Sequence, residues 1–152
     1  MKKSCYSFIA FMISIFFAGG SPAYCAEQTP EEFVKEFYTW YIAKTLESNG
    51  NPEESDEIYN YVHPCTINKL KVENEKGIRD FEYFVTSQDF DPASDAVPVV
   101  GKSVKISETV SIVPAGYKDS VFPKGEPYFI VFVEKQKGRL RIIKVEGSHP
   151  DG

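Results

Sequence analysis

His63-Pro64-Cys65 is the one stretch of the sequence in which a histidine stands close to a cysteine. A thiol nucleophile needs a base within hydrogen-bonding distance and a third group that orients this base. Two residues separated by a proline rarely reach that geometry, and His149 is the only other histidine of the chain. We therefore interpret His63 and Cys65 as structural residues. The sequence also lacks the His and Cys spacings that are typical of metal sites.

Carboxylates are the other groups with chemical potential. Asp89, Asp91 and Asp95 begin like a calcium loop, but Ala93 and Ser94 occupy the positions where an EF-hand has an oxygen ligand and a glycine. Many glutamates lie between residues 31 and 57. Nothing in their spacing sets two of them at the roughly 5–9 Å that glycoside hydrolysis uses. A phosphate-cradling glycine loop and a nucleophile elbow are both absent. We predict a protein that is not an enzyme and holds no metal or cofactor.

The segment 114–127 is the main candidate for binding. It would connect two strands, for which two to five residues are usually enough, and it contains aromatic residues. Long loops of this kind often bind partners. The residues expected to contact a protein partner are Tyr117, Lys118, Asp119 and Phe122. The structural alternative is a surface loop whose aromatic side chains fold back onto the sheet.

A small-molecule pocket between the first helix and the sheet is a second hypothesis. Its lining would be Trp40, Tyr41, Tyr83 and Gln88. At helical spacing, however, Trp40 and Tyr41 are more often core residues than ligand contacts. Tryptophan accessibility would separate the two interpretations.

Helices are expected first along the chain. Thr29-Pro30-Glu31-Glu32 combines a cap, a proline at the first helical position and a capping-box glutamate. An aromatic stripe follows at i, i+4, i+7 and i+8, typical of a helix that faces a core. This helix should end near residues 46–48, before Asn49-Gly50-Asn51-Pro52. Further short helices are expected over 54–62, 66–72 and 80–86.

The second half of the chain has the composition of strands. Runs rich in valine, isoleucine and aromatic residues cover 97–107, 109–113, 128–135 and 139–145. Lys137-Gly138 should join the last two runs as a tight hairpin. Helices that precede antiparallel strands predict an α+β domain with about four strands. We find no internal repeat and no linker, so residues 27–152 are expected to form a single domain.

Residues 1–26 have the pattern of a secretory signal peptide: two lysines, an apolar run and small residues. Cleavage after Ala23 would leave Cys25, which could then form a disulfide with Cys65 in an oxidising compartment. Cleavage after Cys25 would leave Cys65 alone. Tyr24 is a poor residue to precede a lipidated cysteine, so we do not expect a lipid anchor. The mature protein is expected in the periplasm, without a stable membrane span.

Charge narrows the choice of partner. The chain carries 17 basic and 22 acidic residues, a net charge of −5. Without Lys2 and Lys3 of the signal segment, 15 basic and 22 acidic residues remain, a net of −7. An acidic domain is a poor match for nucleic acid, which selects basic patches. It suits a basic protein better. Solubility alone is the simpler explanation of the same charge.

The order of motifs resembles a family of small exported bacterial proteins of unknown function that includes YbjP-like envelope lipoproteins. Pro30-Glu31-Glu32-Phe33 with Phe37-Tyr38-Thr39-Trp40-Tyr41 resembles its opening helix. Glu82-Tyr83-Phe84 followed by Gln88-Asp89 resembles its Asp-Tyr-Phe…Gln-Asp signature, with Glu82 in place of Asp. The segment 138–142 resembles its closing Gly-x-Trp-x-Ile strand, with Leu140 in place of Trp.

This resemblance implies an NTF2-like or cystatin-like fold, with helices on a curved antiparallel sheet. Related domains are similar to periplasmic immunity proteins of type VI secretion, which block cell-wall amidases. The resemblance thus implies an inhibitor whose partner is a basic secreted hydrolase. An envelope-maintenance protein, or a binder of an unknown small ligand, is the alternative.

Overall fold

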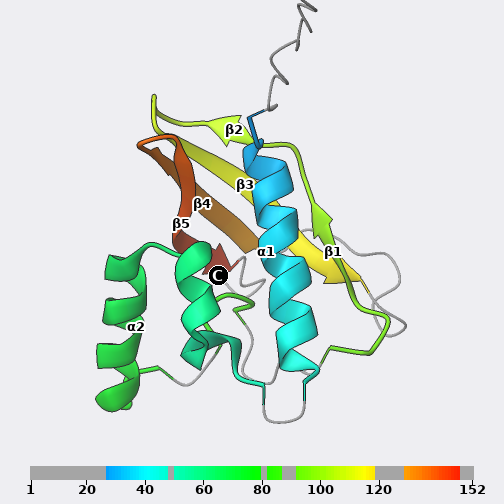
Figure 1. The fold of residues 1–152 in the computed structure, drawn as a ribbon, viewed down its shortest axis with the longest axis vertical. Coiled ribbons are helices and arrows are strands. Elements are labelled where there is room, and N and C mark those ends of the chain that lie inside the picture. The colour runs from blue at the N-terminus through cyan, green and yellow to red at the C-terminus, as the bar shows by residue number, and fades with distance from the viewer. Residues whose placement is uncertain (1–26, 48–49, 80–81, 87–91, 119–128, 148–152) are drawn as a thin grey trace, which may run out of the picture.

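A long aromatic helix packed on an antiparallel sheet dominates the computed structural model, which describes residues 27–47, 50–79, 82–86, 92–118 and 129–147 (Figure 1). The helical elements are α1 (Pro30–Thr45), the 3₁₀ turns η1 (Pro52–Glu54) and η2 (Asp56–Asn60), and α2 (Pro64–Glu75). The strands are β1 (Val97–Val100), β2 (Val104–Lys105), β3 (Val110–Lys118), β4 (Phe129–Gln136) and β5 (Arg139–Gly147). None of the helices in these described ranges is long and apolar enough to cross a membrane.

Helix α1 begins where the sequence predicts. The Thr29 side chain accepts the Glu32 N–H at 3.2 Å, and the Glu32 carboxylate accepts the Thr29 N–H at 2.9 Å. These reciprocal bonds satisfy two of the amides that a helix start leaves without partners. Pro30 occupies the first helical position, where no N–H is needed. The predicted capping box is therefore confirmed.

The core lies between α1 and the inner face of the sheet. Phe37 and Tyr41 of α1 are completely buried, and Phe37 packs edge-on against Phe84 with ring centroids 5.4 Å apart. Tyr38 packs against Phe129 of β4 at 4.9 Å. The sheet contributes these buried residues to the core: Val113, Ala115, Phe129, Val131, Val133, Ile142 and Val145. The period-two alternation expected of a half-buried sheet is thus present in β3 and β4.

The sheet is open and entirely antiparallel. Its order is β1-β3-β4-β5, and the short β2 also pairs with β3. Helix α1 lies across the sheet, and α2 lies beside the β5 end (Figure 1). The predicted α+β fold is confirmed, with five strands rather than about four. The extra strand arises because the expected strand 97–107 is divided into β1 and β2, with residues 101–103 between them in neither strand.

The turn between β4 and β5 is the predicted Lys137-Gly138 hairpin. Both residues have positive φ, 50° and 78°, as a two-residue primed turn requires. The outer edge of β5 is occupied by the chain before α2: Ile142 N–H donates to the Tyr61 carbonyl at 2.8 Å, and His63 N–H donates to the Ile142 carbonyl at 2.9 Å. This short parallel contact protects the edge strand, and it also places Tyr61 beside α1.

Two expected helices take other forms. The segment 54–62 forms 3₁₀ turns instead of one helix, because Ser55 is extended and its hydroxyl accepts the Glu57 N–H to start a second turn. The prediction of a helix over 80–86 is wrong where the structure describes this segment. Residues 83–86 form a turn, and Thr86 has a φ of 49°. Here the backbone bonds to distant groups, since Tyr38 donates to the Phe84 carbonyl at 2.7 Å. The third expected helix is present and longer, as α2.

The prediction of a loop over 114–127 is wrong for its first residues. Residues 114–118 belong to β3 and pair with β1, with Val97 opposite Lys118 and Pro98 opposite Tyr117. The strand expected over 109–113 stops before Pro114, a residue type that is disfavoured within sheets. Pro114 lacks only the N–H, however, and its carbonyl accepts the Gly101 N–H at 2.8 Å. Residues 119–127 lie outside the described residues.

Glu31 joins α1 to the connection between β1 and β2. Its Oε1 accepts the Ser103 N–H at 2.8 Å. The Ser103 hydroxyl, then this backbone N–H, lower the pKa of Glu31 below its usual 4.5. Since the folded-state pKa is lowered, the bond stabilises the protein above pH 4.5 and is lost as the pH falls through the folded pKa.

We expect Glu31→Gln to cost about 1 kcal/mol at pH 7, since water partly screens the carboxylate. The difference from the unmutated chain should shrink as the pH is lowered below 4.5 and Glu31 becomes protonated. Urea unfolding over a pH series that starts at 7 measures it, with Glu108→Gln at an exposed turn as the charge-matched control. A difference that stays constant over the series would contradict the assignment.

Candidate functional site

The described residues contain no cluster of three or more potential metal ligands. His63 caps α2, and its Nδ1 accepts the Cys65 N–H at 3.2 Å. The imidazole therefore bonds to backbone, as the structural interpretation of this pair predicts. Two hollows that the described residues form lie instead along α1.

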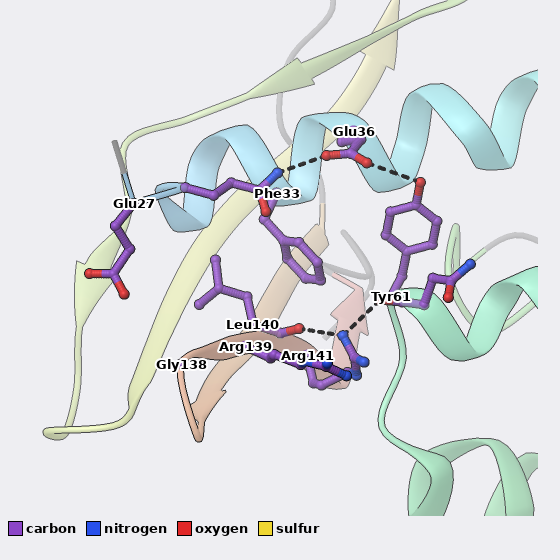
Figure 2. Close-up of a pocket in the computed structure, with 10 residues that line it drawn as sticks. Glu27, Phe33, Glu36, Tyr61, Gly138, Arg139, Leu140 and Arg141 are labelled. Atoms are coloured by element: carbon purple, nitrogen blue, oxygen red, sulfur yellow. Dashed lines mark hydrogen bonds between the residues drawn. The ribbon is translucent and has the colours of Figure 1, made fainter. Parts of the chain in front are cut away.

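One hollow, here called the hairpin pocket, lies between the start of α1 and the β4–β5 hairpin (Figure 2). Its volume is about 420 Å³. Its lining residues are Glu27, Gln28, Phe33, Glu36, Asn60, Tyr61, Gly138, Arg139, Leu140 and Arg141. Carboxylates on the α1 side thus face arginines on the hairpin side, with Phe33 and Leu140 between them (Figure 2).

Hydrogen bonds fix the walls of the hairpin pocket. Glu36 accepts the Gln28 amide at 2.7 Å and the Tyr61 hydroxyl at 3.3 Å. Arg141 donates to the carbonyls of Asn60 at 2.7 Å and Leu140 at 3.0 Å, which ties the hairpin to η2 (Figure 2). The pocket offers both charges and hydrogen-bonding groups, and its lining residues include no serine, threonine, cysteine or histidine. Such a surface is suited to recognising a polar partner.

A second, more open hollow, here called the α1 groove, continues from the hairpin pocket along the helix. The two share Glu36 and Tyr61. The groove has a volume of about 500 Å³ and is lined by Glu32, Lys35, Glu36, Thr39, Trp40, Ala43 and Tyr61. The Trp40 and Tyr61 rings stack with centroids 5.3 Å apart and an interplanar angle of 30°. The Trp40 indole N–H donates to Glu57 at 2.8 Å.

The described residues of the predicted small-molecule pocket do not line one common cavity in the structure. Trp40 is half-buried and lines the α1 groove. Tyr41 is completely buried, and its hydroxyl donates to Glu82 at 3.2 Å. Burial first, and the charges of Glu53 and Glu82 next, raise the pKa of Tyr41 well above 10, so its phenol stays protonated. Tyr83 accepts the Val145 N–H at 3.1 Å. Gln88 lies outside the described residues.

The predicted partner-binding residues begin at the end of β3. Tyr117 is half-buried and packs against the core, and Lys118 is exposed. Asp119 and Phe122 lie outside the described residues. Cys65 is exposed at the start of α2. Cys25 also lies outside the described residues, so the Cys25–Cys65 disulfide stays a prediction.

The residues that build the α1 groove around Trp40 were not among the site residues expected from the sequence. Glu32, Glu36 and Thr39 carry a usable signal, because polar positions at helical spacing beside an aromatic stripe mark the helix face next to the core. Tyr61 carried none. Its ring reaches Trp40 only because the segment before α2 pairs with β5.

No protein-family model and no curated protein matches this chain. Solved structures do match. The native type VI effector-immunity complex Tae3–Tai3 from Ralstonia pickettii matches with a TM-score of 0.68 and 23% identity, over 82% of this chain and 98% of that chain. The selenomethionine form of the complex matches with a TM-score of 0.62 and 21% identity, over 82% and 100% of the chains. This chain therefore shares its fold with a protein of a type VI effector-immunity complex.

Proposed function

We propose that this chain is an exported immunity-type protein that binds and inhibits a type VI effector, most concretely a cell-wall amidase. The observation that carries the proposal is the fold likeness to a chain of the Tae3–Tai3 complex, which extends over nearly the whole of that chain. In this proposal the protein acts as a binder and has no enzymatic activity of its own.

Three features of the chain support the immunity side of such a pair. The expected signal peptide would bring the protein to the periplasm, where an enzyme that attacks the cell wall acts. The net charge of −7 beyond residue 26 would steer a basic effector toward it. The described hollows include arginine and aromatic side chains, which are residue types enriched at protein interfaces. The kinship with YbjP-like proteins and the single domain over 27–152 remain predictions.

The experiment is a protection assay with the effector encoded beside this chain. The effector is directed to the periplasm of a bacterial host, where it should lyse the cells. Co-production of the full chain should restore growth, and the two purified proteins should elute as one stoichiometric complex. A chain without residues 1–26 should bind in solution but fail to protect, because it is not exported. The proposal would be overturned if the full chain neither protected the cells nor formed a complex with the effector.

Binding of a small molecule remains the alternative prediction to binding of an effector. It would require a ligand to reach the side chains of Tyr41 and Tyr83, and Tyr41 is completely buried between α1 and the sheet. No observation on the described residues favours it over a protein partner.

A further inference from the structure

The α1 groove has the composition of a site for a cationic side chain. The residues that line it include two stacked aromatic rings, Trp40 and Tyr61, and two glutamates, Glu32 and Glu36. Glu57 adds a third carboxylate at the indole N–H of Trp40. Lys35 is the one basic residue among those that line the groove. Aromatic faces attract cations through the negative charge of the ring, and carboxylates reinforce this attraction.

The rings are held in place before any partner arrives. Glu57 accepts from Trp40, and Glu36 accepts from Tyr61, so each ring is fixed at its polar end by a carboxylate. Phe37, completely buried, supports both rings from below with centroid distances of 5.9 Å to Trp40 and 5.6 Å to Tyr61. Fixed side chains lose little freedom on binding, which favours affinity.

The same carboxylates act electrostatically on Tyr61. The pKa of Tyr61 is raised, first by burial and then by the charges of Glu36 and Glu57. Both carboxylates therefore act on the ring that lines the groove. A carboxylate oxygen that already accepts one hydrogen bond has a further lone pair. Glu36 and Glu57 can thus each accept from an incoming donor while they keep the two rings in place.

We propose that the α1 groove seats an arginine side chain of the protein partner, with the guanidinium against Trp40 and Tyr61 and bonded to the carboxylates of Glu36 and Glu57. Arginine fits better than lysine, because its planar group stacks on aromatic rings and also bonds to carboxylates in a fork. This inference rests on the proposed function for the identity of the partner. The chemistry of the groove does not depend on it.

The first experiment uses Trp40 itself, the only tryptophan of the chain. Its fluorescence reports on the groove directly. The probes are acetyl-Gly-Arg-Gly-amide and the same peptide with citrulline, which is neutral but similar in shape. We expect a saturable change in emission with the arginine peptide that weakens as salt rises. The citrulline peptide should produce none. Equal responses to both peptides, or no saturable response to arginine, would overturn the site.

The second experiment measures effector affinity for a Glu36→Gln, Glu57→Gln double variant. Both residues are exposed, so the fold should persist, and glutamine keeps an acceptor for each ring. The matched control is Glu75→Gln with Glu108→Gln, which removes the same charge elsewhere on the exposed surface. We expect the groove variant to bind roughly tenfold or more weakly than the control.

The outcomes separate the two proposals. Equal affinities of the groove and control variants would overturn the arginine site and leave the immunity function standing. If the unmutated chain does not bind the effector, the immunity function fails, and the peptide titration decides the groove by itself. Thermal unfolding of each variant should stay at the value of the unmutated chain, which confirms that only the groove has changed.

Discussion

Replacing Glu53 by alanine should lower the free energy of unfolding by about 3–5 kcal/mol, the cost of leaving a buried charge without its partner. Glu53 and Arg79 form a two-bonded pair, with N–O distances of 3.0 and 2.5 Å, and their side chains are only 15% and 6% exposed. Glu53 also accepts the Tyr83 N–H at 3.2 Å. The pair therefore joins η1 to the segment after α2 and to the turn at 83–86.

Thermal or urea unfolding measures this effect. The loss should lower the midpoint by roughly 10–20 °C for a domain of this size. Glu54→Ala is the matched control, because Glu54 is the next residue and exposed. Replacing both Glu53 and Arg79 by methionine should recover most of the stability, since an apolar pair of similar volume avoids the desolvation of two charges. A small effect of Glu53→Ala, equal to that of the control, would contradict the assignment.

The second large effect concerns the affinity for the proposed effector, tested at the end of β3. If the sequence-based interface is right, Tyr117→Ala combined with Phe122→Ala should weaken binding by more than about 2 kcal/mol, which is roughly thirtyfold. Aromatic side chains provide much of the energy of protein interfaces because they bury a large area with little loss of freedom. Isothermal titration with the effector measures the change.

The structure changes one expectation for this variant. From the sequence, both aromatic residues were expected to lie in a loop, so their removal should have left stability unaffected. Tyr117 instead packs against the core within β3, opposite Pro98 of β1. Tyr117→Ala should therefore also lower the unfolding temperature. Phe122→Ala alone isolates the interface effect.

The matched control for Phe122→Ala is Ile106→Ala, which removes an exposed apolar side chain at another edge of the sheet. Ile106→Ala should leave effector affinity unchanged. Full affinity in both Phe122→Ala and the double variant would exclude this interface and direct attention to the α1 groove. Loss of affinity with Ile106→Ala would place the interface at the other edge.

Elements whose signals are local could be predicted from the residues alone. The start of α1 is specified by residues 29–32, because the capping bonds form between residues three apart. The Lys137-Gly138 hairpin is specified by two residues that accept positive φ. The aromatic stripe of α1 and the alternation of β4 identify the buried faces, because each element has a fixed side-chain period. These signals were enough for the α+β fold.

Features that depend on partners distant in the sequence became visible in the folded chain alone. Residues 83–86 look helical, but Tyr38 binds the Phe84 carbonyl from 46 positions away, and the helix does not form. Pro114 looks like the end of a strand, but β1 and β4 pair with its neighbours on both sides.

The candidate site likewise depends on partners that are distant in the sequence. Trp40 could be identified from its position on α1, but not the Tyr61 ring stacked on it or the carboxylates that hold both rings. Glu57, which binds the Trp40 indole, lies 17 positions away in η2. The groove exists because the segment before α2 pairs with the edge of β5 and brings Tyr61 to α1. That pairing depends on backbone groups, whose hydrogen-bonding capacity is almost the same at every position and so leaves no trace in the residue pattern.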